Sequence, residues 1–249
     1  MLNKILYGPF KKKLNMDGVT LVEDFYSDTD FVQFYNQALK DESYKDLKVL
    51  KNILFTNDTI LEIGSGSGRV FNTLSAEGYN IYGLEPSVEM NKYILNEYKS
   101  KIFNIKIQEL DKLVDKELLF SKIIIPATTI SLFSHEDFED FLKKSESILD
   151  LKGSIIFDFI NPQYLDSING KINLMNYKES KYYFSNYIEY PFFILNVFLQ
   201  QGSLKKLGYS IKHLYSIDYL NNLCNKYNYS LDVIFKNDTY LMVEMKKNA

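Results

Sequence analysis

The sequence predicts an α/β fold in which a mostly parallel sheet carries helices on both faces. From residue 59 onward, short apolar runs alternate with amphipathic segments, which is the pattern of strands joined by crossover helices. Three prolines, Pro86, Pro126 and Pro162, each follow an apolar run and mark the end of a strand. All three are therefore expected at the carboxyl edge of the sheet, where open α/β sheets bind their ligands.

The individual elements follow from the spacing of apolar residues. A helical region is expected over residues 30–54, with a charged break near Asp41 and Glu42. Strands are expected at residues 59–63, 80–84, 102–107, 120–125 and 153–160. Helices are expected at residues 70–77, 87–99, 135–149 and 217–227, and Ser87 is expected to cap the second of them. Residues 231–235 and 240–245 are expected to close the fold as a hairpin.

Residues 163–210 interrupt the alternation of strands and helices. They are rich in tyrosine and phenylalanine among polar residues, and we interpret them as antiparallel strands inserted as a lid. The predicted division is an N-terminal helical segment, 1–55, packing on a core of residues 56–162 and 211–249, with residues 163–210 as a substrate-binding insertion.

Composition limits the class of protein. The 249 residues suit one sizeable α/β domain, and a net charge of −3 with a pI near 5.6 disfavours nucleic acid as the main substrate. Cys224 is the only cysteine, so no intramolecular disulfide can form and a cytoplasmic location is expected. The longest apolar stretch, residues 190–199, is about half of a membrane span, so no membrane association is expected. A homodimer remains open.

The most informative segment is a glycine-rich turn. A short apolar run with Glu62 near its end precedes Gly64, Gly66 and Gly68. Alternate glycines here predict a strand that turns sharply into a helix over a ligand that needs bare backbone. A dinucleotide site favours Gly-x-Gly-x-x-Gly, which requires glycine where Arg69 stands. The spacing therefore favours a ligand without a pyrophosphate at the helix terminus.

A second acidic residue, Glu85, closes the next predicted strand. It lies 21 positions after Gly64, about the interval expected for an acid that binds a ribose. A carboxylate at this place can accept hydrogen bonds from both ribose hydroxyls. The two motifs together predict a nucleoside ligand.

With these motifs, residues 30–160 resemble the class I S-adenosylmethionine-dependent methyltransferases, whose first motif is acidic-x-Gly-x-Gly-x-Gly. The resemblance implies a Rossmann-like, mostly parallel seven-stranded sheet with S-adenosylmethionine as cofactor. It is closest to small-molecule methyltransferases with a lid before the last helix. The cofactor-binding residues that it implies are Tyr35, Glu62, Ile63, Gly64, Ser65, Gly66, Gly68, Arg69, Glu85, Pro86, Met90, Glu109, Leu110, Pro126, Ala127 and Thr128.

Several of these assignments have alternatives. The resemblance puts Met90 beside the adenine, whereas spacing alone makes it helix core. Glu109 aligns with the acid that takes the adenine amino group, and Asp111 is a nearby competitor. Arg69 would hold the cofactor's carboxylate or pair with Glu62, or it is a surface arginine that begins a helix.

Substrate contacts and a general base are sought around the same edge. The resemblance implies that the hydroxyl-rich segment 125–133 runs toward the acceptor, with Ser131 and Phe133 as substrate-binding residues. In the aromatic insertion, Tyr177 and Tyr183 are further candidates for substrate binding. The only histidines, His135 and His213, are the candidate bases, although His135 also fits the start of a capped helix. No Cys, His and carboxylate cluster has metal-ligand spacing, so no metal is expected.

The predicted activity is methyl transfer to nitrogen or oxygen of a small molecule or short modified peptide. Residues 161–164, Asn-Pro-Gln-Tyr, look like the Asn/Asp-Pro-Pro-Tyr box of nucleobase amino-methyltransferases but lack its second proline and follow the fifth strand, not the fourth. Two alternatives remain: an NAD(P)-dependent oxidoreductase and a non-catalytic S-adenosylmethionine-binding module. Arg69 and the missing Tyr-x-x-x-Lys pair argue against the oxidoreductase.

Overall fold

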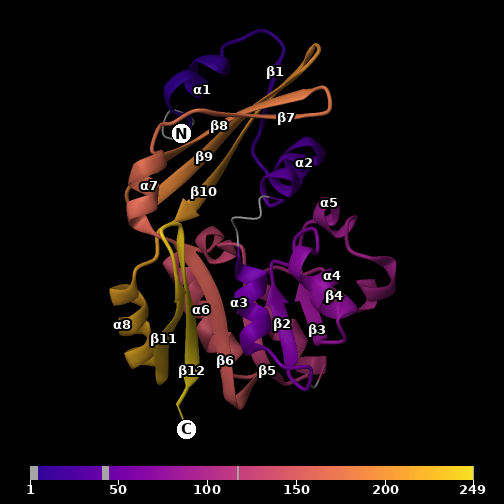
Figure 1. The fold of residues 1–249 in the computed structure, drawn as a ribbon, viewed down its shortest axis with the longest axis vertical. Coiled ribbons are helices and arrows are strands. Elements are labelled where there is room, and N and C mark those ends of the chain that lie inside the picture. Colours follow the sequence, from indigo (N-terminus) through magenta and orange to yellow (C-terminus); the bar gives the residue numbers. More distant parts are fainter. Residues whose placement is uncertain (1–4, 41–44, 117, 249) are drawn as a thin grey trace. The chain divides into compact units, whose positions relative to one another are not determined.

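The computed structural model describes residues 5–40, 45–116 and 118–248 and divides into two compact units (Figure 1). The first unit is Met1–Tyr44 with Pro162–Leu214, and the second is Lys45–Asn161 with Tyr215–Ala249. This division differs from the predicted one, because residues 1–44 group with the insertion while residues 45–55 belong to the core. The predicted break at Asp41 and Glu42 lies outside the described residues.

The second unit contains the predicted seven-stranded sheet, with strand order β11-β12-β6-β5-β2-β3-β4. All neighbouring pairs among the first five strands in sequence are parallel, and β12 runs antiparallel to both β6 and β11. This confirms the mostly parallel sheet. The strands are β2 (Thr59–Ile63), β3 (Asn80–Leu84), β4 (Ile102–Phe103), β5 (Phe120–Ile125), β6 (Leu149–Ile160), β11 (Tyr229–Lys236) and β12 (Tyr240–Lys247).

Three helices of this unit, α5, α6 and α8, begin at a serine whose side chain caps them. Ser87 accepts a hydrogen bond from the Met90 amide, as predicted, and Ser134 forms a capping box with Asp137. The α-helices are α3 (Asp46–Ile53), α4 (Arg69–Ala76), α5 (Val88–Asn91), α6 (His135–Ser145) and α8 (Ile217–Tyr227). Short 3-10 helices lie at η2 (Asn96–Lys101), η3 (Ile107–Lys116) and η4 (Thr129–Leu132).

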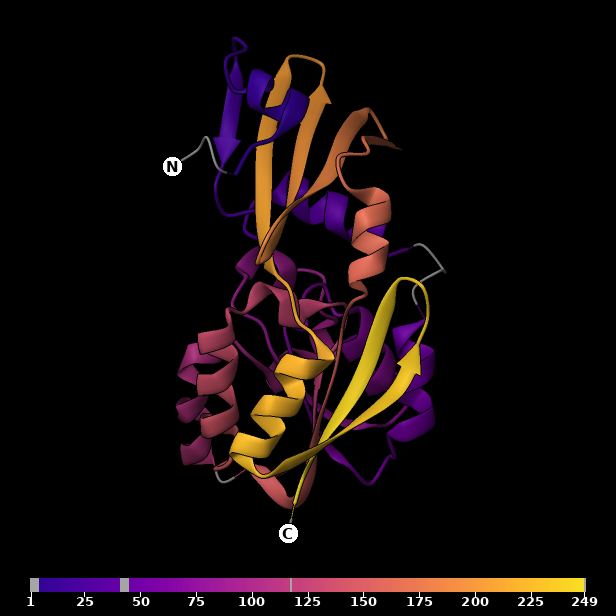
Figure 2. The same cartoon turned by 90° about the vertical axis from the view of Figure 1, so that its left-hand side faces the viewer.

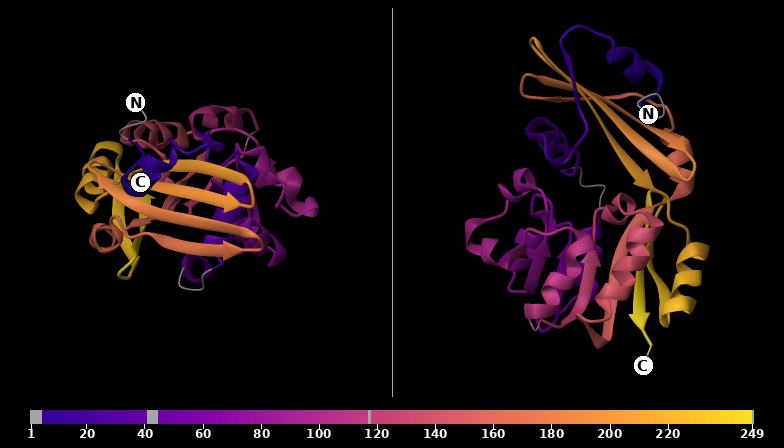
Figure 3. Two further views of the ribbon diagram at one scale, coloured as in Figure 1. Left: turned by 90° about the horizontal axis from the view of Figure 1, so that it is seen from above. Right: turned by 180° about the vertical axis from the view of Figure 1, so that it is seen from behind.

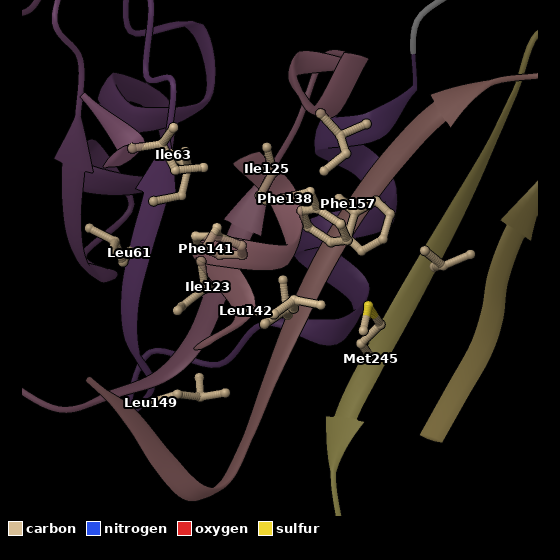
Figure 4. Close-up of a cluster of buried hydrophobic side chains, with 14 of the residues drawn as sticks. Leu61, Ile63, Ile123, Ile125, Phe138, Phe141, Leu142, Leu149, Phe157 and Met245 are labelled. Carbon is tan, nitrogen blue, oxygen red and sulfur yellow. The ribbon is translucent and has the colours of Figure 1, made fainter. Parts of the chain in front are cut away.

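One face of the sheet carries the main hydrophobic core. Ile63, Ile125 and Phe157, from three neighbouring strands, gather around Phe138 and Phe141 of α6 (Figure 4). Helix α8 lies beside α6 and contributes to the same cluster (Figure 2). Because successive strand residues point to opposite faces, the remaining buried residues of β2 point to the other face of the sheet, where α3 and α4 lie (Figure 1).

Four predicted elements have a clearly different extent in the structure. The helix expected over 87–99 ends at Asn91, and the side chain of Asn72 then bonds the backbone of Tyr93 and Leu95, which holds this stretch out of a helix. The strand expected over 102–107 keeps only Ile102–Phe103, because Ile107 turns into η3 and becomes buried in the core. Helix α6 ends at Ser145, four residues early, and β6 starts at Leu149.

The first unit is built on a five-stranded sheet with strand order β1-β10-β9-β8-β7, and its orange strands lie side by side in the left view of Figure 3. The four later strands are antiparallel, as predicted, and β1 adds to the edge in parallel with β10. The elements are α1 (Gly8–Lys13), β1 (Val19–Val22), α2 (Thr29–Ala38), α7 (Pro162–Ile168), β7 (Asn173–Tyr177), β8 (Ser180–Glu189), β9 (Phe192–Gln201) and β10 (Leu204–His213).

Both faces of this five-stranded sheet are covered. On one face Phe31 and Phe34 of α2 pack with Tyr182 and Val197, and on the other Phe10 of α1 packs with Phe198. The β1 pairing and these two helices explain why residues 5–38 belong to this unit, although no element was predicted before residue 30. In the part of the chain that the structure describes, no helix combines the length and apolar character that crossing a membrane requires.

Candidate active site

The carboxyl ends of β2, β3 and β5 define the candidate site in the second unit. Strand β2 lies between β3 and β5, so the chain moves to one side of β2 first and to its other side later. Such a switch point leaves a crevice beyond the strand ends, where open α/β sheets bind ligands. The predicted glycine turn, Glu85 and the segment after Ile125 all follow these three strands.

The glycine turn is held tightly against β3. The amides of Gly64 and Ser65 both donate to the Leu84 carbonyl, at 2.8 and 3.1 Å. All three glycines have positive φ, and a Cβ on Gly64 would lie 2.5 Å from a Thr129 methyl. A Cβ on Gly66 would meet nothing closer than 3.9 Å, so Gly66 alone borders open space. This is the position at which a ligand can approach bare backbone.

Glu85 is fixed at the tip of β3 by two backbone amides. Its two carboxylate oxygens accept from the amides of Gly66 (2.8 Å) and Ser87 (2.7 Å), and the residue is only 7% exposed. Burial raises the pKa of the Glu85 carboxyl, and the two amide hydrogen bonds oppose that rise. Each oxygen retains a further acceptor direction, so the group suits a pair of neighbouring hydroxyls.

Glu62 is a buried acid whose charge is poorly compensated. It is 2% exposed, and among the residues that the structure describes its Oε2 has no hydrogen-bond partner. Burial raises the pKa of the Glu62 carboxyl to about 8, although the charge of Arg69 and a hydrogen bond from Ser65 both act to lower it. A cationic group placed beside Glu62 would supply the missing compensation. The acid therefore fits a ligand that carries an ammonium group.

Arg69 has a partner that was not predicted. Its guanidinium makes a two-pronged contact with the carboxylate of Asp46 on α3, whose side chain is fully buried; the Nη1–Oδ1 distance is 2.8 Å. This pair joins α3 to α4, and the expected contacts of Arg69 with Glu62 or a cofactor carboxylate stay predictions. Arg69 still acts on Glu62 through its charge.

The segment after β3 holds the backbone of Glu85 in place. Asn91 donates to the Glu85 carbonyl at 3.1 Å and to Asn104 Oδ1 at 2.7 Å. Met90 is buried on α5, and Pro86 is exposed beside Glu85. Asn91 is thus a supporting residue that periodicity alone did not reveal.

The structure places Glu109 and Leu110 in local roles. The Glu109 carboxylate accepts from the Lys106 amide at 3.0 Å and pairs with Lys112, contacts that lower its pKa. Leu110 is fully buried in the core. The Glu109 contacts lie within or next to η3, whereas Leu110 belongs to the same cluster as Ile63, the residue before Gly64.

A strained turn follows β5. Ala127 and Thr128 have φ of 60° and 52°, and the Thr128 amide donates to Asp158 Oδ2 at 2.9 Å. Ser131 is buried and its hydroxyl donates to the Thr128 carbonyl at 2.7 Å. Pro126 is buried, Ala127, Thr128 and Phe133 are partly exposed, and Leu132 is exposed, so this segment still offers surface to a ligand.

The two histidines each contact aromatic rings. His135 begins α6 and stacks on Tyr219 with ring centroids 3.9 Å apart, and the Tyr219 hydroxyl donates to the His135 carbonyl. His213 lies in the first unit at the end of β10, 5.0 Å from the ring of Phe192. A role as general base for either one stays a prediction.

The remaining predicted site residues belong to the first unit. Tyr35 lies on α2 with its ring edge-on to Tyr26. Tyr177 packs with the cluster on the α2 face of the sheet, whereas Tyr183 packs with the cluster on the α1 face. The two predicted substrate tyrosines therefore point to opposite faces of one sheet and do not line one surface together.

Sequence reasoning missed Asp158, a fully buried acid on β6. It interrupts the apolar run 155–160 near the end of β6, much as Glu62 interrupts the apolar run of β2. An isolated acid in a buried strand is costly unless it is hydrogen-bonded, so this pattern could have found it. The burial of Asp46 could not be predicted from such a pattern, because it depends on the pairing with Arg69 from another helix.

Comparisons with known proteins agree on the architecture. A scan against models of protein families finds no match. A solved S-adenosylmethionine-dependent methyltransferase from Clostridium acetobutylicum matches with a TM-score of 0.68 at 16% identity, over 88% of this chain and 98% of that one. The S-adenosylmethionine-bound amino pentose methyltransferase CalS10 from Micromonospora echinaspora matches with a TM-score of 0.63 at 9% identity, over 87% and 97% of the two chains.

The fold is thus the Rossmann-like fold of the class I S-adenosylmethionine-dependent methyltransferases, in agreement with the predicted fold class. At the level of sequence, the chain is similar to the ribosomal RNA small subunit methyltransferase A of Mycoplasma mobile. The two are 24% identical over 220 residues, which span 75% of this chain and 85% of that protein.

Proposed function

We propose that this protein is an S-adenosylmethionine-dependent methyltransferase that methylates nitrogen or oxygen of a small molecule or short modified peptide. The observation that carries the proposal is Glu85, a buried carboxylate held at the tip of β3 by the Gly66 amide, next to the open space above Gly66. A nucleoside that reaches this edge meets an acceptor for its ribose hydroxyls and bare backbone beside it.

The buried acids of the site suit the two polar ends of this cofactor. Glu85 would accept the ribose hydroxyls, and Glu62 would face the ammonium group of the amino-acid part, for which its uncompensated oxygen is suited. When bound, S-adenosylmethionine supplies a methyl group on a positively charged sulfur. The protein's part is then to align the acceptor with that methyl group and to exclude water, and alignment alone can contribute about 7–11 kcal/mol.

An amine of a small acceptor is the first substrate to test. The matching CalS10 structure is described as an amino pentose methyltransferase, and this chain covers 97% of it. An amine must lose a proton before it attacks, and a solvent-exposed amine can release it to water. This reading requires no dedicated base, which agrees with the aromatic contacts of both histidines.

Methylation of ribosomal RNA is a second candidate, favoured by the similarity to the Mycoplasma mobile enzyme. Two features count against it. The Asn-Pro-Gln-Tyr segment follows β6, the fifth strand, whereas β5 is followed by Pro126-Ala127-Thr128. The net charge of −3 offers no general attraction to a phosphate backbone.

The oxidoreductase alternative fits the sheet less well. Dinucleotide-binding folds carry six parallel strands in the order 3-2-1-4-5-6. Here β12 runs antiparallel beside β6, and a hairpin partner, β11, completes the sheet. Titration with NADH, followed by its fluorescence, would reveal binding if this alternative held.

Calorimetry with S-adenosylmethionine and S-adenosylhomocysteine tests the proposal directly. Glu85→Ala should weaken binding by about tenfold or more, because a hydrogen bond to a charged group contributes ~1.5–3 kcal/mol. Glu109→Ala is the matched control, since that acid is exposed and bound to its own helix. Equal affinities of wild type and Glu85→Ala would remove Glu85 from the site.

Transfer of label from S-adenosylmethionine identifies the acceptor class. The purified protein would be incubated with a panel of aminosugars, with amine-bearing peptides, and with unmethylated small ribosomal subunits. Label in an aminosugar or peptide supports the proposal, and label in RNA alone would move the assignment to the second candidate. Tight cofactor binding with no labelled acceptor in any arm would favour the non-catalytic binding module.

A further inference from the structure

We infer that Asp158 is a positioning residue that holds the strained turn after β5 against the glycine turn of the cofactor site. The inference rests on the proposed function, and it concerns residues of the second unit only. The role of Asp158 is to fix the backbone that borders the predicted ligand-binding acids, through its hydrogen bond with the Thr128 amide.

The turn adopts a conformation that its residues disfavour. Ala127 and Thr128 both have positive φ, and Thr128 has the full left-handed geometry, φ 52° and ψ 23°. A β-branched residue in this region is a rare outlier, because its Cβ crowds the following carbonyl. Such conformations persist only when the surrounding structure imposes them, and they cluster at functional sites.

The surrounding structure imposes this one through both polar groups of the Thr128 backbone. Its amide donates to Asp158 Oδ2 at 2.9 Å, and its carbonyl accepts from the hydroxyl (2.7 Å) and the amide (2.9 Å) of Ser131. Asp158 is fully buried on β6, the strand that pairs with β5. It therefore reaches across the end of β5 from a rigid neighbour, which a loop residue could not do.

The turn held in this way packs closely against Gly64, the first glycine of the glycine turn. The Thr129 methyl lies 2.5 Å from where a Cβ of Gly64 would be, which leaves no space for a side chain between the two turns. Gly64 in turn donates to the Leu84 carbonyl, just before Glu85. A displaced 126–131 turn would therefore loosen the glycine turn and, through Gly66, the hold on Glu85.

Four variants separate this role from a general loss of stability. Asp158→Ala removes the acceptor, and Asp158→Asn keeps an oxygen that can accept from Thr128. Asp158→Ala combined with Thr128→Gly removes the acceptor but also the strain at residue 128, because glycine adopts positive φ freely. Ser154→Ala is the control, since Ser154 is buried in the middle of β6 and bonds Lys122 and Glu244.

Two measurements are made on each full-length variant: calorimetry with S-adenosylhomocysteine, and hydrogen exchange of the peptide that covers residues 126–133 without ligand. We expect Asp158→Ala to weaken binding by about tenfold and to speed exchange in that peptide, with Asp158→Asn within about threefold of wild type. The double variant should recover most of the lost affinity, and Ser154→Ala should bind as wild type does.

The outcomes are distinct. Wild-type affinity and exchange in Asp158→Ala overturn the inference, as does a double variant that binds no better than Asp158→Ala alone. If the wild type binds neither S-adenosylhomocysteine nor S-adenosylmethionine, the proposed function fails. In that case the exchange of residues 126–133 still decides whether Asp158 holds the turn.

Discussion

Replacement of Glu62 by glutamine should change how the stability of the protein depends on pH. Burial raises the pKa of this carboxyl from its ordinary 4.5 to about 8, while Arg69 lowers it and the charges of Asp46 and Glu85 raise it further. Between these two values the folded state keeps a proton that the unfolded state has lost. The free energy of unfolding must therefore fall as pH rises through this window.

The size of the effect follows from the difference in pKa. At ~1.4 kcal/mol per unit, the interval from 4.5 to about 8 corresponds to up to about 5 kcal/mol. Glutamine has nearly the same shape and does not titrate, so Glu62→Gln should lack this part of the decline. We expect the wild type to lose at least ~2 kcal/mol more than the variant between pH 5 and pH 8.5.

The assay is urea unfolding at several pH values, followed by circular dichroism because the chain contains no tryptophan. Glu244→Gln is the control: this acid lies in the same sheet, but Ser154 and Lys122 lower its pKa. Glu244 stabilises the fold above its unfolded pKa and loses that effect as pH falls, so its variant should keep the alkaline decline of the wild type. Parallel pH profiles of wild type and Glu62→Gln would refute the reasoning.

Two further predictions concern the glycine turn and the pair beneath it. Gly66→Ala and Gly78→Ala both place a Cβ at positive φ in open space. Each should lower the free energy of unfolding, measured in urea, by about 1–2 kcal/mol. Only Gly66→Ala should abolish S-adenosylhomocysteine binding, measured by calorimetry. Loss of binding in both would mean that strain, not contact with the ligand, is responsible. Arg69→Met should destabilise by about 3 kcal/mol, because it leaves Asp46 buried without its partner, and Asp46→Asn in the same chain should restore part of that loss. Additive losses in the double variant would show that the pair does not act as a unit.

Local sequence determined much of the core. Strands β2, β3 and β5 match the predicted boundaries, because each is a short apolar run between turn residues. Helix α8 also matches, since Ser216 caps it and Asn228 ends it in the left-handed conformation. The glycine turn and Glu85 were found for the same reason: their chemistry depends on residue type and spacing along the chain.

Contacts between distant segments decided what the sequence pattern alone did not predict. The helix after Ser87 stops early because Asn72, from another helix, takes the backbone bonds of residues 93 and 95. The Glu109 carboxylate, by contrast, accepts a hydrogen bond from the nearby Lys106 amide, and its contact with a ligand stays a prediction. For residues 93 and 95 the possible partners are equivalent in the sequence, and only their positions in space distinguish them.

By itself, the sequence determined the class of fold and the edge of the sheet at which a ligand would bind, because strand periodicity and glycine spacing are local properties. Only the tertiary structure decided the partners of the charged groups: Arg69 with Asp46, Glu62 with little compensation, and Asp158 with the Thr128 amide. The physical reason is that burial and pairing of a charge depend on which elements pack around it, and these elements are more than 20 residues apart in the sequence.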